Sequence, residues 1–316
     1  MVQFENVGVR YGTGPEVLSD ITFELPDGSF HFVTGPSGAG KSSLLKLMYL
    51  ALRPSRGLIK LFDRNAAEIE REELPGLRRQ IGVVFQNFRL IDHLSTFDNV
   101  ALPLRVAGAQ ESLIQKHVGE LLGWVGLADH LEARPPTLSG GQQQRVGIAR
   151  SLAVEPDIWF LDEPFSALDP LIRKEMQDEF LRLQEKLQKT IMFITHDFDE
   201  ALKLADRIAI MKDGIIEQLD TPAKIVLNPA TEYVRKFTEE VPREKVLLIE
   251  DVMDSSTSDN VSDLKVSKDE VIENVAEKIL TQEKTVTVID KNNQIVGSIN
   301  PRKIINTVFG GRKNNN

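Results

Sequence analysis

The amino-acid sequence predicts an α/β fold with a mixed sheet, followed by a small α+β unit. Three observations support this prediction. Short apolar runs alternate with helical patterns as far as about residue 220. One of these runs, residues 30–35, leads through a glycine-rich loop into a helical pattern. Residues 95–137 show helical patterns without a strong strand, which indicates an inserted helical subdomain over about residues 87–155.

The individual strands are short and apolar. Residues 2–7 and 18–25 are expected to form an antiparallel β subdomain at the N-terminal end. Further strands are predicted at residues 30–35, 81–86, 157–162, 190–195 and 207–212. Those at 157–162 and 190–195 are apolar at every position between their end residues, which is typical of a sheet covered on both faces. The intervening helices, such as residues 171–189, repeat their apolar residues with the helical period.

The composition changes toward the C-terminal end, and we expect residues 1–241 to form the first domain. Residues 242–264 mix charges with Ser and Asp, which is typical of a linker. Residues 265–310 read as a helix, a two-stranded hairpin and a second helix that starts at Pro301. Residues 311–316 are expected to be a disordered tail.

Composition excludes several classes of protein. The chain has no cysteine, which excludes a disulfide scaffold and thiolate metal sites. Its net charge of −9 argues against a nucleic-acid partner. No apolar run approaches the roughly 18 residues of a membrane helix, and the start lacks the pattern of a secretory signal. We therefore expect a cytoplasmic protein that does not itself span a membrane.

The first glycine-rich loop predicts a phosphate site. Residues 35–42 fit the pattern G-x-x-x-x-G-K-[ST] between a strand and a helix, and this context argues against a chance glycine turn. The glycines let backbone N–H groups converge on phosphate oxygens at the helix start. Lys41 would reach the β- and γ-phosphates, and Ser42 would contribute its hydroxyl to Mg²⁺. The expected nucleotide-binding residues of this loop are Gly35, Pro36, Ser37, Gly38, Ala39, Gly40, Lys41, Ser42 and Ser43.

Acidic and imidazole side chains follow two predicted strands. Asp162 ends the apolar run 157–162, at the sheet edge where ligands collect, and fits the residue that holds Mg²⁺ through water. Glu163 could orient or polarise the attacking water. His196 follows the next strand and could bond the γ-phosphate region. The alternatives are a solvated carboxylate pair and a structural histidine.

The second glycine-rich stretch, "LSGGQ" at residues 138–142, cannot cradle the same γ-phosphate, which already has its loop and Lys41. Ser139 fits an N-cap, and Gly140 and Gly141 allow close backbone approach. We therefore expect this helix start to face the nucleotide of a second copy, with two ATP molecules between two chains packed head to tail. A plain helix cap is the alternative for an isolated pentapeptide.

These motifs occur together in the order seen in ATP-binding-cassette (ABC) ATPases: residues 35–42, Gln86, "LSGGQ", "WFLDEP", "SALD" and His196. Residues 1–241 resemble that family. The resemblance implies a P-loop ABC-type nucleotide-binding domain that hydrolyses ATP with Mg²⁺ and forms a homodimer with ATP at the interface.

The resemblance also implies roles for single residues. Tyr11 resembles the aromatic residue that stacks on adenine, and Asp169 the aspartate of the dimer interface. Gln86 resembles the residue that contacts Mg²⁺ and links the site to a membrane partner. The signature that closes on the opposite ATP corresponds to Ser139, Gly140, Gly141 and Gln142. The catalytic set comprises Glu163, His196 and Gln86, and the metal set comprises Ser42, Gln86 and Asp162.

The two parts of the chain resemble different ABC subfamilies. Residues 1–137 resemble the cell-division ATPase FtsE, and residues 138–316 resemble the ProV-like ATPases of glycine betaine, proline and choline importers. Residues 265–310 are similar to a single cystathionine-β-synthase (CBS) repeat, with a purely structural tail as the alternative. An importer of a quaternary-amine osmoprotectant is the favoured function. The alternatives are a division-site ATPase that regulates cell-wall hydrolysis and a soluble ABC ATPase of repair or translation, although the sequence lacks the coiled-coil insertion or second cassette of the latter.

The importer interpretation implies an integral-membrane permease, a solute-binding protein and a peripheral location on the cytoplasmic face of the plasma membrane. A cluster beside Gln86 could receive a short cytoplasmic helix of the permease. This cluster comprises Phe85, Phe88, Leu90, Ile91 and Leu94. Internal packing of the helical insert is the alternative role for these residues.

Overall fold

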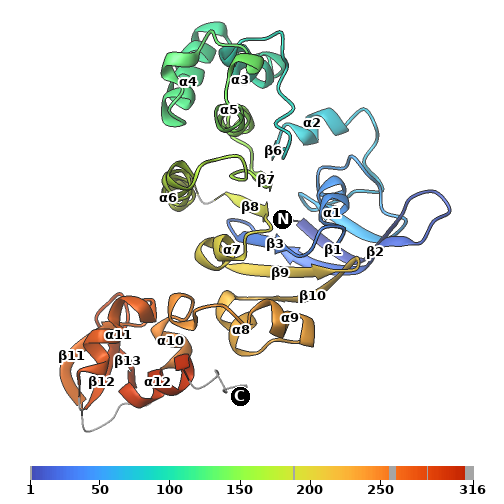
Figure 1. Ribbon diagram of the computed structural model, residues 1–316. Helices are drawn as coiled ribbons and strands as arrows, with labels where there is room; N and C mark the ends of the chain where they lie inside the picture. The colour runs from blue at the N-terminus through green and yellow to red at the C-terminus, as the bar shows by residue number, and fades with distance from the viewer. Residues whose placement is uncertain (1, 188, 256–260, 283, 310–316) are drawn as a thin grey trace. The chain divides into compact units, whose positions relative to one another are not determined.

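The structure is a computed structural model that describes residues 2–187, 189–255, 261–282 and 284–309 (Figure 1). The chain divides into two compact units, Met1–Glu217 and Gln218–Asn316. Within the described ranges, no helix is long and apolar enough to cross a membrane.

The first unit begins with a four-stranded sheet in the order β2-β1-β4-β5, and each pair of neighbours is antiparallel. Its strands are β1 (Val2–Arg10), β2 (Glu16–Leu25), β4 (Arg56–Leu61) and β5 (Arg64–Asn65). Buried and exposed residues alternate along the second half of β2, as expected for a sheet with one packed face. The predicted antiparallel β subdomain is therefore present.

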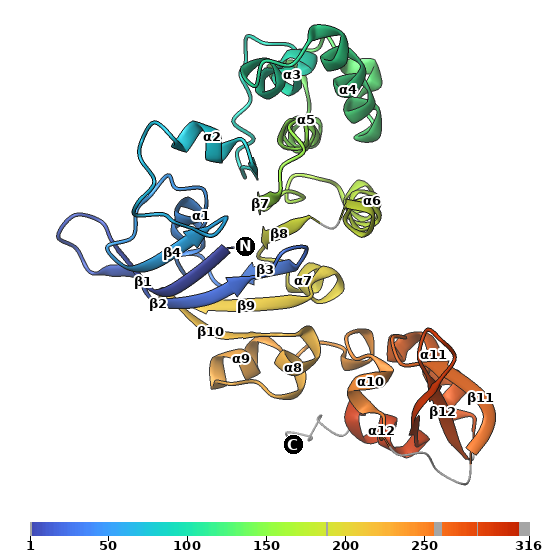
Figure 2. The ribbon, with the colours of Figure 1, turned by 180° about the vertical axis from the view of Figure 1, so that it is seen from behind.

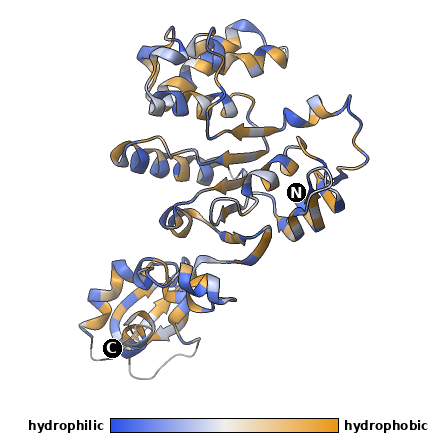
Figure 3. Cartoon of the chain, turned by 45° about the vertical axis from the view of Figure 1, so that its right-hand side comes forward, coloured by the Kyte–Doolittle hydropathy of each residue, from blue (hydrophilic) through white to orange (hydrophobic). Residues whose placement is uncertain are grey.

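A six-stranded sheet forms the centre of the first unit, in the order β10-β9-β3-β8-β7-β6 (Figures 1 and 2). Its strands are β3 (Phe30–Thr34), β6 (Ile81–Val84), β7 (Ile158–Asp162), β8 (Thr190–Ile194), β9 (Arg207–Lys212) and β10 (Ile215–Asp220). The five strands from β9 to β6 run parallel. Every residue of β3 and β8 is buried, because helices cover both faces, and Figure 3 shows these strands as hydrophobic.

Four helices pack beside this sheet: α1 (Lys41–Met48), α2 (Leu74–Arg78), α6 (Pro170–Leu187) and α7 (Phe198–Leu204). An aromatic cluster forms part of the core. Phe32 and Phe193 stack with ring centroids 4.5 Å apart, and Phe180 of α6 meets Phe165 edge to face. This packing fixes the strands whose carboxyl ends carry the predicted site.

The predicted helical subdomain is present between β6 and β7. Its helices are α3 (Thr96–Val106), α4 (Glu111–Trp124) and α5 (Gly140–Leu152), with short 3₁₀ turns at Ala128–His130 and Pro135–Thr137. Ser95 caps α3 by accepting from the Asp98 N–H, and the buried Asn99 side chain ties the helix to the Ile91 backbone. This subdomain carries the second glycine-rich stretch at the start of α5.

The second unit contains a three-stranded sheet in the order β11-β12-β13, in which β12 pairs parallel with β11 and antiparallel with β13. Its elements are α8 (Pro222–Leu227), α9 (Glu232–Phe237), a 3₁₀ turn (Arg243–Lys245), α10 (Ile249–Val252), β11 (Val261–Ser267), α11 (Ile272–Leu280), β12 (Thr285–Ile289), β13 (Ile295–Ile299) and α12 (Pro301–Phe309). The expected helix, hairpin and helix are thus present, with β11 as an additional strand.

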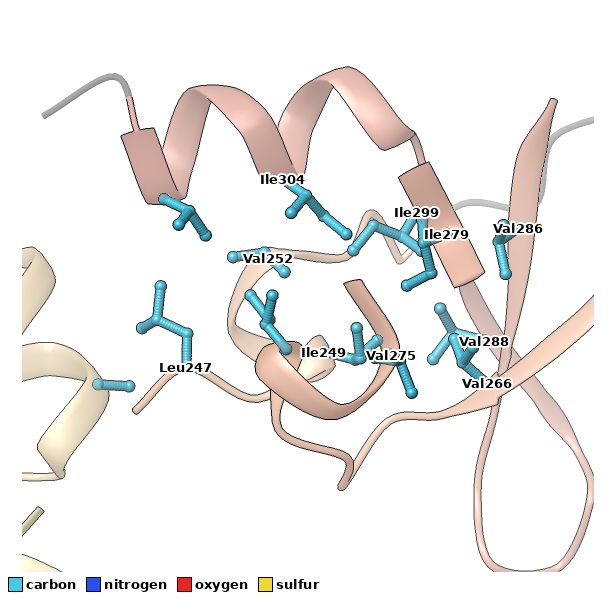
Figure 4. Packing of buried hydrophobic residues seen from close by; sticks show 13 residues of the cluster. Leu247, Ile249, Val252, Val266, Val275, Ile279, Val286, Val288, Ile299 and Ile304 are labelled. Atoms are coloured by element: carbon cyan, nitrogen blue, oxygen red, sulfur yellow. The ribbon is translucent and has the colours of Figure 1, made fainter. Parts of the chain in front are cut away.

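The described part of the expected linker 242–264, residues 242–255 and 261–264, contributes to the core of the second unit, which corrects the sequence interpretation for these residues. Leu247, Ile249 and Val252 are buried in the same hydrophobic cluster as Ile299, and Figure 4 shows them packed inside the second unit. The sequence does not predict this burial. The helix α10 is only four residues long, so its apolar residues form no recognisable helical repeat, and charged residues surround them. The compact second unit also begins at residue 218 rather than after 241. The tail expected at residues 311–316 lies outside the described residues.

Candidate active site

The predicted phosphate loop joins β3 to α1, and two of its glycines are required by its path. Gly35 has φ 146°, and a Cβ there would collide with the carbonyl oxygen of Met211. Gly40, at φ 98°, is the N-cap of α1, and a Cβ there would lie 2.5 Å from a methyl group of Leu18. These glycines let the backbone turn sharply against β9 and β2. The first backbone N–H groups of α1, which have no partner within the helix, therefore lie at the edge of the sheet.

Lys41 lies at the start of α1 with its ammonium group over the loop. Its Nζ donates to the carbonyl oxygens of Gly35 at 2.6 Å and Pro36 at 2.9 Å. Burial lowers the pKa of Lys41, and the charges of Glu163 and Asp162 partly oppose that effect. The site therefore holds a partly desolvated cation close to two carboxyl groups.

Three loops of neighbouring strands meet around Glu163. Gln86 follows β6, Glu163 follows β7 and His196 follows β8, and these strands are adjacent in the sheet. Gln86 Nε2 donates to Glu163 Oε2 at 2.9 Å, and His196 Nδ1 lies 3.1 Å from Glu163 Oε1. The three residues expected to be catalytic are thus brought together around one carboxylate.

The backbone at Glu163 is unusual. Glu163 has φ 48°, a left-handed conformation that costs a non-glycine residue roughly 1–3 kcal/mol and is common at functional sites. Its N–H donates to the Ile194 carbonyl oxygen at 2.9 Å. Its own carbonyl oxygen accepts from the Ser166 hydroxyl and from the side-chain amide of Gln144, each at 2.9 Å. Sequence reasoning missed Gln144, which lies on α5 and has no motif of its own.

The residues expected to hold Mg²⁺ share one cavity. A space of 270 Å³ is lined by Ser42, Gln86 and Asp162, together with Phe85 and Arg89 among others. Burial raises the pKa of Asp162, and the charge of Glu163 raises it further, while Lys41 and Arg89 oppose the shift. Arg89, which also stacks over the Phe85 ring at 4.1 Å, is a second charged neighbour that sequence reasoning missed.

This set of oxygen atoms fits Mg²⁺. The ion prefers hard oxygen ligands and usually keeps several waters while it binds substrate phosphates. In the part of the chain that the structure describes, no group of three or more His, Cys, Asp or Glu side chains could hold a metal by itself. Ser42 and Gln86, with Asp162 through water, would hold the ion beside the phosphates, whose charge it would neutralise.

Tyr11 lies at the edge of the phosphate loop. Its hydroxyl group is 3.1 Å from the Ser43 hydroxyl, and nearly half of the residue is exposed to solvent. An exposed ring beside α1 can stack on a planar base. Its role in adenine binding remains a prediction.

The second glycine-rich stretch makes local contacts. Ser139 caps α5 in a capping box with Gln142: its hydroxyl accepts from the Gln142 N–H, and Gln142 Oε1 accepts from the Ser139 N–H. Gln142 Nε2 also lies 3.0 Å from His130 Nε2. Gly140 and Gly141 open the same helix, and a Cβ on Gly141 would approach Leu168 at 3.2 Å. Binding of this stretch to a second copy's nucleotide stays a prediction.

Asp169 caps the next helix. Its Oδ1 accepts from the N–H groups of Leu171 and Ile172, each at 3.1 Å, at the start of α6. Within one chain, therefore, the Asp169 side chain organises the end of the loop that begins at Glu163. Its expected place at a dimer interface is a separate property that stays a prediction.

The site has the parts needed for phosphoryl transfer to water. A carboxylate with two side-chain partners can orient water and accept its proton. A lysine at a helix start and a metal held by oxygen atoms can neutralise phosphate charge.

Comparison with known proteins agrees with this chemistry. A family model described as "ABC transporter" matches residues 18–166. The trimethylamine N-oxide transport system ATP-binding protein TmoW of Pelagibacter ubique is 62% identical over 297 residues, which cover 94% of this chain and 87% of that protein. The glycine betaine/proline betaine transport system ATP-binding protein ProV of Salmonella typhimurium is 42% identical over 249 residues, 78% of this chain and 61% of that protein.

A solved structure is also similar. The ATP-binding cassette MJ0796, in a dimeric post-hydrolysis state bound to ADP and Pi, has a TM-score of 0.67 and 33% identity. The match covers 70% of this chain and 99% of that chain. The predicted fold class is therefore confirmed.

The expected change of subfamily near residue 138 is not supported. The relative from Pelagibacter ubique matches 94% of the chain, so one transport ATPase accounts for both parts. The resemblance of residues 1–137 to the cell-division ATPase FtsE is unconfirmed, and the division function has no support. The resemblance of the C-terminal unit to a CBS repeat is likewise unconfirmed.

An identity of 62% over 94% of the chain shows that the protein belongs to the ABC transporter ATP-binding proteins. It is an ATPase that uses ATP with Mg²⁺.

Proposed function

We propose that the chain energises the import of a small solute with a methylated nitrogen, such as trimethylamine N-oxide or a betaine. The 62% identity with an ATPase named for trimethylamine N-oxide transport carries this proposal. Relatives named for glycine betaine and carnitine transport, at 44% and 37% identity, support the wider class. These relatives, rather than the site, support the proposed solute class, because an ATPase subunit does not itself contact the solute.

We propose the following roles in hydrolysis. Glu163 orients the attacking water and accepts its proton, and Gln86 and His196 hold its two carboxylate oxygens. His196 bonds the γ-phosphate once nucleotide is present. Lys41 leaves the loop carbonyls and binds the β- and γ-phosphates.

We further propose that two copies bind two ATP molecules between them, with Ser139, Gly141 and Gln142 of one copy facing the nucleotide of the other. The dimeric state of MJ0796 supports this arrangement. The partners would be an integral-membrane permease and a solute-binding protein, with the ATPase on the cytoplasmic face of the plasma membrane. A nucleic-acid partner does not fit a net charge of −9.

A groove on the first unit suits the permease. It has a volume of 480 Å³, and its apolar lining includes Phe85, Leu102 and Val106. Arginine side chains surround it: Arg78, Arg79, Arg89 and Arg150. We propose that a short cytoplasmic helix with acidic residues docks here. Phe85 belongs to the five-residue cluster expected from the sequence, whereas α2 and α3, rather than the remainder of that cluster, supply much of the groove.

The second unit is proposed to regulate the ATPase. The carnitine transport ATPase OpuCA of Listeria monocytogenes matches 96% of this chain, so its match extends into the second unit. Ala223 of α8 belongs to the same buried cluster as Leu247 and Ile249, so the second unit must be removed as a whole. A test that keeps β10 whole removes residues 221–316 and measures basal and permease-stimulated hydrolysis separately. A purely structural role would reduce both rates together.

Solute uptake tests the main proposal. The chain would be produced with its membrane partners in cells that lack other osmolyte importers, and uptake of labelled trimethylamine N-oxide, glycine betaine and carnitine would be measured. We expect uptake of at least one, and none with the Glu163→Gln variant. Normal complex formation and ATP hydrolysis without uptake of any methylated amine would contradict the proposed solute class.

A further inference from the structure

We propose that Gln144 is a positioning residue for Glu163. Gln144 lies on α5 and is fully buried, with an exposed fraction of 0%. Its Nε2 donates to the Glu163 carbonyl oxygen at 2.9 Å, and its Oε1 accepts from the Ala167 N–H at 3.2 Å. One side-chain amide therefore bridges the two ends of the turn from Glu163 to Ala167.

The bridge matters because Glu163 occupies a strained backbone conformation. At φ 48° the turn persists only where surrounding contacts determine it. Buried Phe165 and Leu168 anchor the turn by packing, but packing is not directional. The hydrogen bond from Gln144 is directional and ends on Glu163 itself, so it sets where the carboxylate lies relative to Gln86 and His196.

The same contact connects two motifs of one chain. α5 begins at the "LSGGQ" stretch, and Gln144 lies only two residues beyond Gln142. A displacement of α5 is therefore transmitted through this amide to the turn that carries Glu163. This inference depends on ATP hydrolysis and not on the proposed solute, so the two can fail independently.

Two substitutions of Gln144 test the role in the full-length protein. Gln144→Met keeps the volume and removes both hydrogen bonds. Gln144→Glu keeps the acceptor for Ala167, but an ionised carboxylate cannot donate to the Glu163 carbonyl oxygen. For both variants we expect kcat for ATP hydrolysis to fall about tenfold to a hundredfold, since small misplacements of catalytic groups have effects of this size. KM for ATP and ATP-dependent dimer formation should change less than about twofold, as neither needs the exact place of the carboxylate.

Gln184→Met is the matched control. The Gln184 amide also donates to backbone carbonyls, those of Gly28 at 3.3 Å and Lys189 at 2.5 Å, but these residues precede β3 and β8 and lie at the opposite edge of the sheet. This variant tests the general cost of losing an amide bridge, and we expect its kcat to match the wild-type value. A fall in kcat equal to that of Gln144→Met, with a similar loss of thermal stability, would overturn the positioning role.

The pH dependence of Gln144→Glu separates positioning from folding. When the carboxyl group introduced by this substitution is protonated, it can donate to the Glu163 carbonyl and accept from Ala167, as the glutamine does. Burial favours the protonated form. The ratio of variant to wild-type kcat should therefore rise as pH falls from about 8 to about 6, while Gln144→Met stays constant. A ratio for Gln144→Glu that stays flat and below the wild-type value, or wild-type kcat in Gln144→Met, would overturn the proposal.

Discussion

Gln86 and Glu163 are separated by 77 residues, yet Gln86 Nε2 donates to Glu163 Oε2 at 2.9 Å. They meet because β6 and β7 are parallel neighbours, so the residues that follow each strand lie at the same sheet edge. The other oxygen of Glu163 faces His196, which follows β8. One carboxylate thus joins three loops, and any change in its charge or position alters all three.

Glu163→Gln should leave ATP binding intact and reduce hydrolysis by about a hundredfold or more, because an amide cannot accept the proton of the attacking water. With hydrolysis stalled, ATP should hold the protein as a dimer on a sizing column. Glu155→Gln is a suitable control, since Glu155 has the same φ of 48° but is exposed and lies before β7. A Glu163→Gln protein that stays monomeric with ATP would count against the two-chain arrangement.

Lys41→Ala should abolish hydrolysis, because it removes the cation that faces the phosphates at the start of α1. Folding should be preserved, since the Nζ donates to carbonyl oxygens of the loop, at Gly35 and Pro36. Measuring the rate of ATP hydrolysis and the midpoint of thermal unfolding separates a loss of activity from a loss of folding. Near-normal turnover in the variant would remove the phosphate-loop assignment.

His31 should make stability depend on pH. It is 2% exposed, and burial, with a smaller effect from Arg207, lowers its pKa to about 4. The unfolded chain takes up a proton near pH 6.5 whereas the folded protein does not, so stability is constant above that value. Below it, about 3 kcal/mol should be lost as pH falls to about 4. His31→Leu should flatten this slope in denaturant titrations, and an unchanged slope in that variant would assign the pH dependence to other groups.

Gly35→Ala should destabilise the first unit by roughly 1–3 kcal/mol, because a methyl group would meet the Met211 carbonyl on β9. Gly38→Ala provides the comparison. Gly38 also has a positive φ, of 83°, but nothing lies within 4 Å of a Cβ there. Because the two glycines also differ in φ, the difference in unfolding free energy between the variants reports the collision together with that difference in strain, and equal values would mean that the collision is relieved.

The strand-end residues could be predicted from the sequence for a simple physical reason. Asp162, Glu163 and His196 each follow a short apolar run, and parallel strands bring their carboxyl ends to one edge. The phosphate loop could also be predicted from the sequence, because its glycines, Lys41 and Ser42 lie within one local segment. Local pattern and sheet geometry were therefore sufficient for these residues.

Residues whose roles depend on packing between distant segments could not be predicted in this way. The contact of Gln144 with Glu163 depends on how α5 lies against the turn after β7, and no local pattern encodes that arrangement. The segment 242–264 shows the same limit. Its buried positions Leu247 and Ile249 share one hydrophobic cluster with residues of α11 and α12, which are distant in the sequence. Burial of this kind is a tertiary property that a charged, irregular sequence does not reveal.

Val106→Glu should weaken capture of the permease from detergent-solubilised membranes by at least about tenfold. Val106 lines the groove and is 65% exposed, so a carboxylate there would replace apolar contact and repel an acidic docking helix. Leu113→Glu is the matched control, because Leu113 is 61% exposed on α4 and does not line the groove. Both variants should unfold at the wild-type temperature, since neither side chain is buried. Equal capture by the two variants would move the docking site away from the groove between α2 and α3.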